Sequence, residues 1–156
     1  MKKHIGWFKD NFAKDLISKE EAGGDNAYAE LVNEAGATPA GAEGVIVLPY
    51  FSGERTPVMD PRAKGMIFGL SLTHTRGHIF RSILEGMGHG FKQHVDLFTA
   101  IGARPHAIKS VGGGTRGKKI NSDISKVWGM LGIHAIAYIT QAYVDHTIKN
   151  LENCIS

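Results

Sequence analysis

Apolar residues recur with helical spacing in two stretches near the start of this chain. Near the start, apolar residues at three- and four-residue steps predict one short helix with a single apolar stripe: Ile5, Phe8, Phe12 and Leu16. A charged, glycine-rich turn follows at residues 20–24. Asn26 can then cap a second helix, which runs through Glu34 and ends at Gly36. Both helices need other elements to pack against.

A much longer helix is predicted from about residue 75 to residue 101, ending at Gly102 as a natural C-terminal cap. Its apolar face consists of Ile79, Ile83, Leu84, Met87, Phe91, Val95 and Phe98. Three glycines interrupt this helix: Gly86, Gly88 and Gly90. Since a glycine costs a helix about 1 kcal/mol relative to alanine, they predict close packing of another backbone.

Strands are predicted on either side of a long polar loop. Residues 45–48 are apolar and mostly β-branched, and Pro49 follows them, which is typical of a strand buried on both faces. Residues 65–70 predict another strand. The segment between them, residues 50–64, has glycine, prolines and no helical period, so it is predicted to be a loop.

Further along the chain, a glycine triplet joins a predicted strand at residues 107–111 to a predicted helix at residues 118–128. Gly112, Gly113 and Gly114 would let backbone N–H groups approach an anionic ligand at the start of that helix. A plain tight turn explains a bare triplet equally well. The basic residues Arg116, Lys118 and Lys119 favour an anion somewhat.

Composition excludes several classes of protein. With 42% hydrophobic and 21% charged residues among 156, the chain is expected to be an ordinary soluble domain. The net charge of +3 comes without a long basic run, so no nucleic-acid partner is expected. Cys154 is the single cysteine, which excludes an intramolecular disulfide and fits a cytoplasmic location. No apolar run approaches the length of about 18 residues that a membrane span needs, so no membrane partner is expected either.

Two polar groupings are candidates for chemistry. His74 and His78 stand one helical turn apart, but no third ligand converges on them, so surface or capping roles are favoured and no metal site is predicted. Glu54, Arg55 and Asp60 lie in the long loop. A carboxylate there could act as a general base, or an ion pair through Arg55 could hold the loop; no catalytic base is assigned from spacing alone.

The loop and the start of the long helix resemble the FGGY carbohydrate kinases. The first similarity lies in Leu48-Pro49-Tyr50-Phe51-Ser52-Gly53-Glu54-Arg55-Thr56-Pro57 and continues through Asp60-Pro61-Arg62-Ala63-Lys64-Gly65. The second matches every position of a family signature: Gly65, Ile67, Gly69-Leu70, His78-Ile79, Ser82-Ile83-Leu84 and Glu85. Overall, the resemblance extends from about Trp7 to Ile124.

This resemblance implies an α/β fold, the C-terminal domain of the actin-like (ribonuclease H-like) ATPases, in incomplete form. The domain would cover residues 1–128, with a divergent or truncated tail at 129–156. In the family such a domain closes with its partner domain on ATP and magnesium, and a glycine turn lies near the adenosine. Gly112, Gly113, Gly114 and Thr115 match that turn and are the expected nucleotide-binding residues.

Departures from the family limit the expected activity. Thr115 stands where alanine is usual, Gly117 stands where serine is usual, and about three residues are absent before Ile120. The family's Gly-Asp segment, with its aspartate base, and its Gly-Thr phosphate loop would precede Trp7, and neither is among these residues. Phosphoryl transfer requires both, so the isolated chain is expected to be inactive, and no catalytic residue is assigned.

The resemblance favours a pentulose kinase, for xylulose or ribulose, over a glycerol kinase, because residues 52–57 have the sequence Ser-Gly-Glu-Arg-Thr-Pro. Sugar would bind only together with the other domain. The alternative is a non-catalytic remnant or pseudokinase that folds and acts as an interaction module, with a homodimer as the expected assembly. An anion- or RNA-binding module on the Gly112 turn has only charge in its favour.

Overall fold

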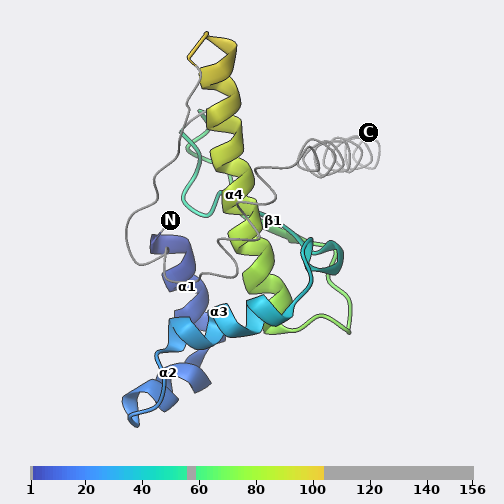
Figure 1. The fold of residues 1–156 in the computed structure, drawn as a ribbon. Helices are drawn as coiled ribbons and strands as arrows, with labels where there is room; N and C mark the ends of the chain where they lie inside the picture. The colour runs from blue at the N-terminus through green and yellow to red at the C-terminus, as the bar shows by residue number, and fades with distance from the viewer. Residues whose placement is uncertain (1, 56–58, 104–156) are drawn as a thin grey trace.

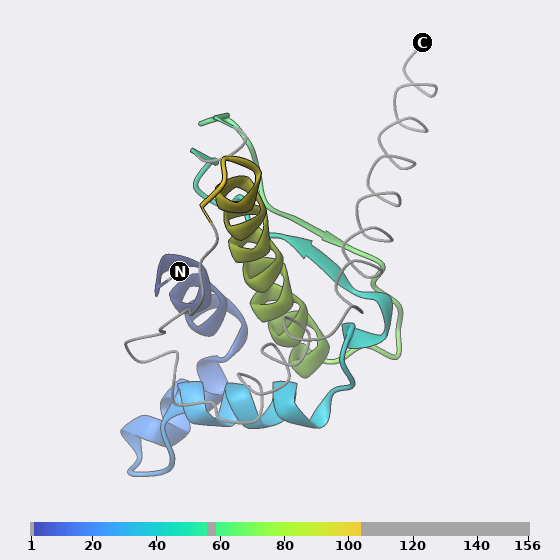
Figure 2. The ribbon, with the colours of Figure 1, turned by 45° about the horizontal axis from the view of Figure 1, so that its top comes forward.

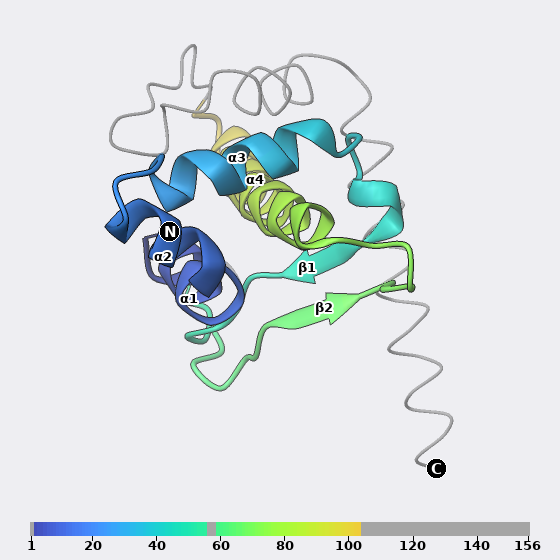
Figure 3. The ribbon, with the colours of Figure 1, turned by 90° about the horizontal axis from the view of Figure 1, so that it is seen from below.

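The computed structural model describes residues 2–55 and 59–103, and the chain in this part forms helices that lie on one side of a two-stranded sheet (Figure 1). In chain order the elements are α1 (Lys2–Phe12), α2 (Lys14–Glu21), α3 (Ala27–Ala37), the 3₁₀ helix η1 (Ala42–Gly44), β1 (Ile46–Leu48), β2 (Met66–Phe68) and α4 (Arg76–Ala100). The long helix α4 lies between α3 on one side and the two strands on the other (Figure 3).

The two strands pair antiparallel, with Val47 opposite Ile67 at the centre of the register. The predicted positions of both strands are confirmed, but burial on both faces is wrong. Val47 is buried against α4, whereas Ile46 and Leu48 on the opposite face are only partly buried. Within the described residues the sheet therefore has one face packed on a helix, as antiparallel sheets commonly do.

The N-terminal apolar stripe is divided between two helices, so the prediction of one helix is wrong. Ala13 has non-helical backbone angles, φ −133° and ψ 37°, and separates α1 from α2. Its carbonyl oxygen accepts hydrogen bonds from the N–H groups of Leu16 and Ile17, which begins α2. The break changes the direction of the chain, and Phe8 in α1 and Leu16 in α2 both enter one core.

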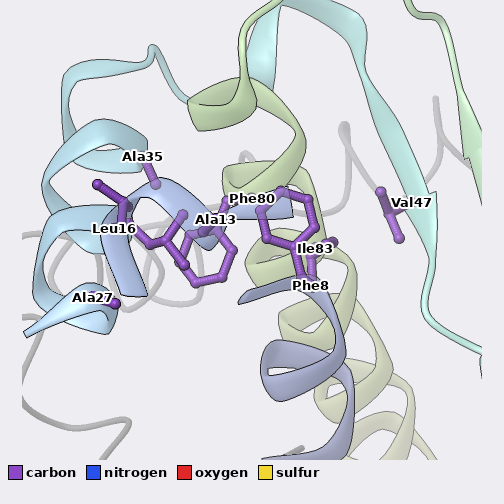
Figure 4. Close-up of a cluster of buried hydrophobic side chains, with 9 residues drawn as sticks. Phe8, Ala13, Leu16, Ala27, Ala35, Val47, Phe80 and Ile83 are labelled. Carbon is purple, nitrogen blue, oxygen red and sulfur yellow. The ribbon is translucent and has the colours of Figure 1, made fainter. Parts of the chain in front are cut away.

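That core joins all four α-helices and β1, and Figure 4 shows how its side chains converge. Its buried members are Phe8, Ala13, Leu16, Ala27, Leu31, Ala35, Val47, Phe80 and Ile83. The rings of Phe8 and Phe80 lie 5.4 Å apart. Small residues on α3 allow the helices to approach closely, and Asn26 caps this helix as predicted, because its side chain accepts from the Tyr28 N–H.

The predicted long helix is confirmed, with Thr75 as its N-cap and Gly102, at φ +86°, just after its end. Its apolar face is buried at Ile83, but Phe91 is 49% exposed and Phe98 52% exposed. The glycines differ: Gly86 faces β1 closely, whereas nothing lies within 4 Å of a Cβ built at Gly90, where the prediction of close packing is wrong. None of the described helices has the length and apolar character needed to cross a membrane.

Candidate functional site

An open pocket of about 600 Å³ lies where the end of α3 meets the start of α4. Figure 2 shows α3 crossing the first turns of α4. The pocket is lined by Glu34, Ala37, Thr38, Pro39, Glu43, Thr75, Arg76 and His78. Only His78 among them is a candidate that the sequence indicates, because the pocket depends on contacts between α3, η1 and α4 that a single sequence does not show.

A buried arginine holds the two walls of the pocket together. Arg81 is 3% exposed and donates hydrogen bonds to the carbonyl oxygens of Ala35 and Thr38, at 3.3 and 2.9 Å, just where α3 ends. Its Nε also donates to Glu85 Oε1 at 2.7 Å. The same carboxylate oxygen accepts from the N–H of Gly41 at 3.1 Å. The Arg81–Glu85 pair therefore satisfies backbone groups that end α3 and begin the next turn.

That next turn has an unusual backbone. Residues 41–44 all have positive φ angles, and two of them, Ala42 at 46° and Glu43 at 51°, are not glycine. Such residues are uncommon in the left-handed region, and the surrounding contacts must hold them there. The turn directs the carboxylate of Glu43 to His78, whose Nε2 lies 3.3 Å from Glu43 Oε2.

Arg76 connects the first turn of α4 to the other helices. Its guanidinium makes two hydrogen bonds to the Glu34 carboxylate in α3, pairs with Asp15 in α2 and donates to the carbonyl oxygen of Phe12 at 3.3 Å. These bonds, those to Glu34 above all, raise the pKa of Arg76, so the guanidinium stays charged. Its hydrogen bond in turn lowers the pKa of the Asp15 carboxyl.

The two histidines at the start of α4 act as caps, as predicted. His74 Nδ1 accepts from the backbone N–H of Ser71 at 2.9 Å, and His78 Nδ1 accepts from that of Thr75 at 3.1 Å. Thr75 and His78 together form a capping box, in which the side chain of each meets the backbone N–H of the other. Within the described ranges, no group of three or more His, Cys, Asp or Glu side chains could hold a metal ion.

The loop with the carboxylates is held by local bonds. The Glu54 N–H donates to the carbonyl oxygen of Asp60 at 2.8 Å, and the Asp60 carboxylate accepts from the N–H of Arg62 at 2.8 Å. Arg62 Nε also lies 3.9 Å from this carboxylate, so the ion pair that the structure shows at Asp60 is with Arg62 rather than Arg55. The Glu54 carboxylate accepts from the N–H of Arg55.

An aromatic contact that the sequence analysis missed fixes this loop against α1. The ring of Phe51 lies 5.0 Å from that of Trp7 and 5.5 Å from that of His4. Partial burial lowers the pKa of His4, and the nearby Glu54 carboxylate opposes this effect only in part. Burial and the Glu54 carboxylate together raise the pKa of Tyr50. The spacing of aromatic residues in α1 could have indicated such a contact, but its partner is more than forty residues away in the chain.

The expected nucleotide-binding residues Gly112, Gly113, Gly114 and Thr115 lie outside the described residues, as do Cys154 and the tail from residue 129. Their roles stay predictions. In the part that is described, the Glu34 carboxylate at the pocket pairs with Arg76, and Glu43 Oε2 lies 3.3 Å from His78 Nε2. Such pairing positions elements, and it assigns no acid or base to a reaction.

Comparison with known proteins identifies the family of this chain. The model of the C-terminal domain of the FGGY family of carbohydrate kinases matches residues 1–142. The chain belongs to this family. The FGGY resemblance of the loop and of the start of α4 is thereby confirmed.

Relatives within the FGGY family include several sugar kinases. The xylulose kinase of Bacillus subtilis is 28% identical over 96% of this chain and 30% of its own length. That of Escherichia coli is 39% identical over 61% of this chain and 20% of its own length. A gluconokinase of Bacillus licheniformis is 36% identical over 53% of this chain. The chain thus spans less than a third of the curated relatives it matches.

Solved structures of FGGY kinases share the fold. A xylulose kinase from Rhodospirillum rubrum has a TM-score of 0.68 and 34% identity, covering 80% of this chain and 23% of that one. A glycerol kinase from Plasmodium falciparum, solved with ADP, has a TM-score of 0.62 and 28% identity, over 78% of this chain and 22% of its own. The described part is accordingly a small portion, with few strands, of the actin-like ATPase fold of these kinases.

Proposed function

We propose that this chain supplies the C-terminal, nucleotide-facing domain of an ATP-dependent carbohydrate kinase, and that its sugar is a pentulose such as xylulose. The similarity to xylulose kinases carries the proposal, because the family model matches residues 1–142 and the Rhodospirillum rubrum enzyme is 34% identical over most of the chain. The reaction is the transfer of the γ-phosphoryl group of ATP to a sugar hydroxyl in the cytoplasm.

The chain's own contribution is proposed to be one wall of the nucleotide site. Gly112, Gly113 and Gly114 lack side chains, so backbone N–H groups there can approach a phosphate or ribose, and Thr115 adds a hydroxyl. Magnesium is expected to arrive on the phosphates of ATP, because Mg²⁺ in kinases is bound through substrate phosphates and a few carboxylates. No described side chain is assigned to it.

Nucleotide binding tests this wall directly. We expect the purified chain to bind ATP with magnesium by calorimetry, and Gly113→Val to abolish binding, because a branched side chain would fill the space that the ligand needs. Gly90→Ala is the matched control, since nothing lies near that position. Equal binding by wild type and Gly113→Val would refute the assignment of the glycine turn.

Catalysis by the isolated chain is not expected. The aspartate base and phosphate loop of the family do not occur in these 156 residues, and phosphoryl transfer depends on both. A coupled ADP-release assay over pentuloses and polyols should therefore show no sugar-dependent turnover. Turnover at ordinary kinase rates would show that the chain contains a complete active site.

A non-catalytic interaction module is the second candidate function. The distal half of α4 and its C-cap residue Ile101 expose apolar side chains, including Phe91, Leu97, Phe98 and Ile101, which are 45–78% exposed. Apolar patches on soluble proteins commonly mark interfaces. We propose that a homodimer would use this face. Light-scattering chromatography over a concentration series tests it: Phe98→Glu should shift a dimer to monomer, whereas a concentration-independent monomer in wild type rejects the dimer.

A further inference from the structure

The apolar face of α4 continues beyond the core of the domain. In the first half of the helix this face is buried, with Phe80 1% and Ile83 0% exposed. In the last turns and at the C-cap, four large apolar side chains are 45–78% exposed: Phe91, Leu97, Phe98 and Ile101. Figure 1 shows these turns extending past the other labelled helices. Among the described residues, the end of α4 therefore presents an apolar surface to solvent.

His94 lies at the centre of this surface. Because a helix turns by about 100° per residue, six neighbours point within about 60° of the direction of His94: Met87, Gly90, Phe91, Leu97, Phe98 and Ile101. The charged pair of these turns, Lys92 with Asp96, points about 160° away from His94. His94 itself is held against its own helix, with Nδ1 2.8 Å from the carbonyl oxygen of Gly90. A surface with this composition fits an apolar partner.

The same surface is complementary to itself. Two α4 helices that lie antiparallel, with a two-fold axis at His94, place Phe91 of each copy beside Phe98 of the other. The same symmetry places Leu97 of each copy over Gly90 of the other. A Cβ built at Gly90 has nothing within 4 Å, so the space that Leu97 needs is open. On both sides of the axis, a large side chain therefore meets a gap.

We propose that two copies of the chain associate through antiparallel α4 helices with His94 on the two-fold axis, a contact that rests on the interaction role proposed above. The contact covers residues 87–101, which is about four helical turns. Phe80 and Ile83 in the first half of α4 anchor the core of each domain. The two cores consequently lie at opposite ends of the helix pair and do not collide.

The area of this contact predicts a weak dimer. An aromatic side chain buries about 150–250 Å² when it is fully covered, so four large apolar side chains that are about half exposed add on the order of 400 Å² per copy. The total of about 800 Å² lies below the roughly 1,200 Å² at which standard interfaces begin. We therefore expect an equilibrium between monomer and dimer rather than a permanent dimer.

Disulfide cross-linking locates the axis. In a Cys154→Ser background, His94→Cys should form a covalent dimer when oxidised with diamide, because residues on a two-fold axis meet their own counterparts. Thr99→Cys is the matched control, since Thr99 is exposed but points about 140° away from His94. Cross-linking of the two variants at equal rates would overturn the antiparallel contact, while leaving a homodimer of another geometry in place.

Sedimentation equilibrium of the reduced wild-type chain measures the association itself, over about 1 μM to 1 mM, the range of weak dissociation constants. Gly90→Gln should raise the dissociation constant about tenfold or more, because its side chain fills the gap that Leu97 occupies. Thr99→Gln should leave the dissociation constant unchanged. A monomer throughout this range, as when residues 104–156 of the same chain cover the surface, would overturn both this contact and the homodimer. Neither nucleotide nor sugar is present, so the kinase proposal is tested separately.

Discussion

Gly86 on α4 lies directly against the carbonyl oxygen of Val47 in β1, so close that a Cβ at Gly86 would stand less than 3.0 Å from that oxygen. Helix and strand therefore approach each other at a position where only glycine fits. Val47 is itself buried in the core. This contact sets the distance between α4 and the sheet.

Gly86→Ala should destabilise the fold by about 1–2 kcal/mol, since the cost of overpacking against backbone exceeds the gain in helix propensity. Gly90→Ala lies in the same helix with nothing near its Cβ and should leave stability unchanged or raise it by up to about 1 kcal/mol. Urea unfolding of both variants gives the comparison. Equal effects of the two substitutions would show that the close approach of α4 and β1 does not exist.

Arg81→Met should destabilise the protein by about 3–5 kcal/mol, because it removes the positive charge beside the partly buried Glu85 carboxylate, which keeps only the Gly41 N–H, and the donor to the end of α3. Arg62→Met removes an arginine whose side chain is 93% exposed and should change stability by less than about 0.5 kcal/mol. The free energy of unfolding from denaturant titration distinguishes the two. A loss below 1 kcal/mol for Arg81→Met would contradict the structural role of the buried pair.

Acid should destabilise the fold through His89. Burial lowers the pKa of this side chain below its ordinary value, although Glu85 opposes the effect. The folded state therefore prefers the neutral ring. The contribution of His89 to the free energy of unfolding is complete above about pH 6.5, which is the pKa of histidine in the unfolded chain. It is lost as the pH falls through the lower pKa that His89 has in the folded state. His89→Gln should reduce the dependence of stability on pH over that interval; an identical pH profile would show that His89 does not contribute.

Helix positions could be predicted from sequence wherever a long period or a cap marks them. The boundaries of α4 follow from its apolar face and from Gly102, and Asn26 begins α3 as predicted. The division at Ala13 could not be predicted, because the stripe from Ile5 to Leu16 keeps its helical spacing across the break. The helix breaks because Phe8 and Leu16 pack in one tertiary core, and the spacing of apolar residues in the sequence does not show this packing.

The pocket was beyond sequence reasoning for a related reason. Its walls depend on contacts between residues far apart in the chain, such as Arg81 with Thr38 and Arg76 with Glu34. A single sequence shows neither pairing. By contrast, the loop and the start of α4 carry a dense set of family residues, and these indicated the FGGY family correctly. The proposed nucleotide turn at Gly112 stays a prediction from sequence.

Domain replacement tests the central claim most directly. The segment of Bacillus subtilis xylulose kinase that aligns with this chain would be replaced by the chain itself, since the two match over 96% of the chain and 30% of that enzyme. We expect a folded chimera that releases ADP from ATP in a xylulose-dependent manner and loses this activity on Gly113→Val but not on Gly90→Ala. A chimera that folds and binds xylulose, yet shows no sugar-dependent turnover, would contradict it.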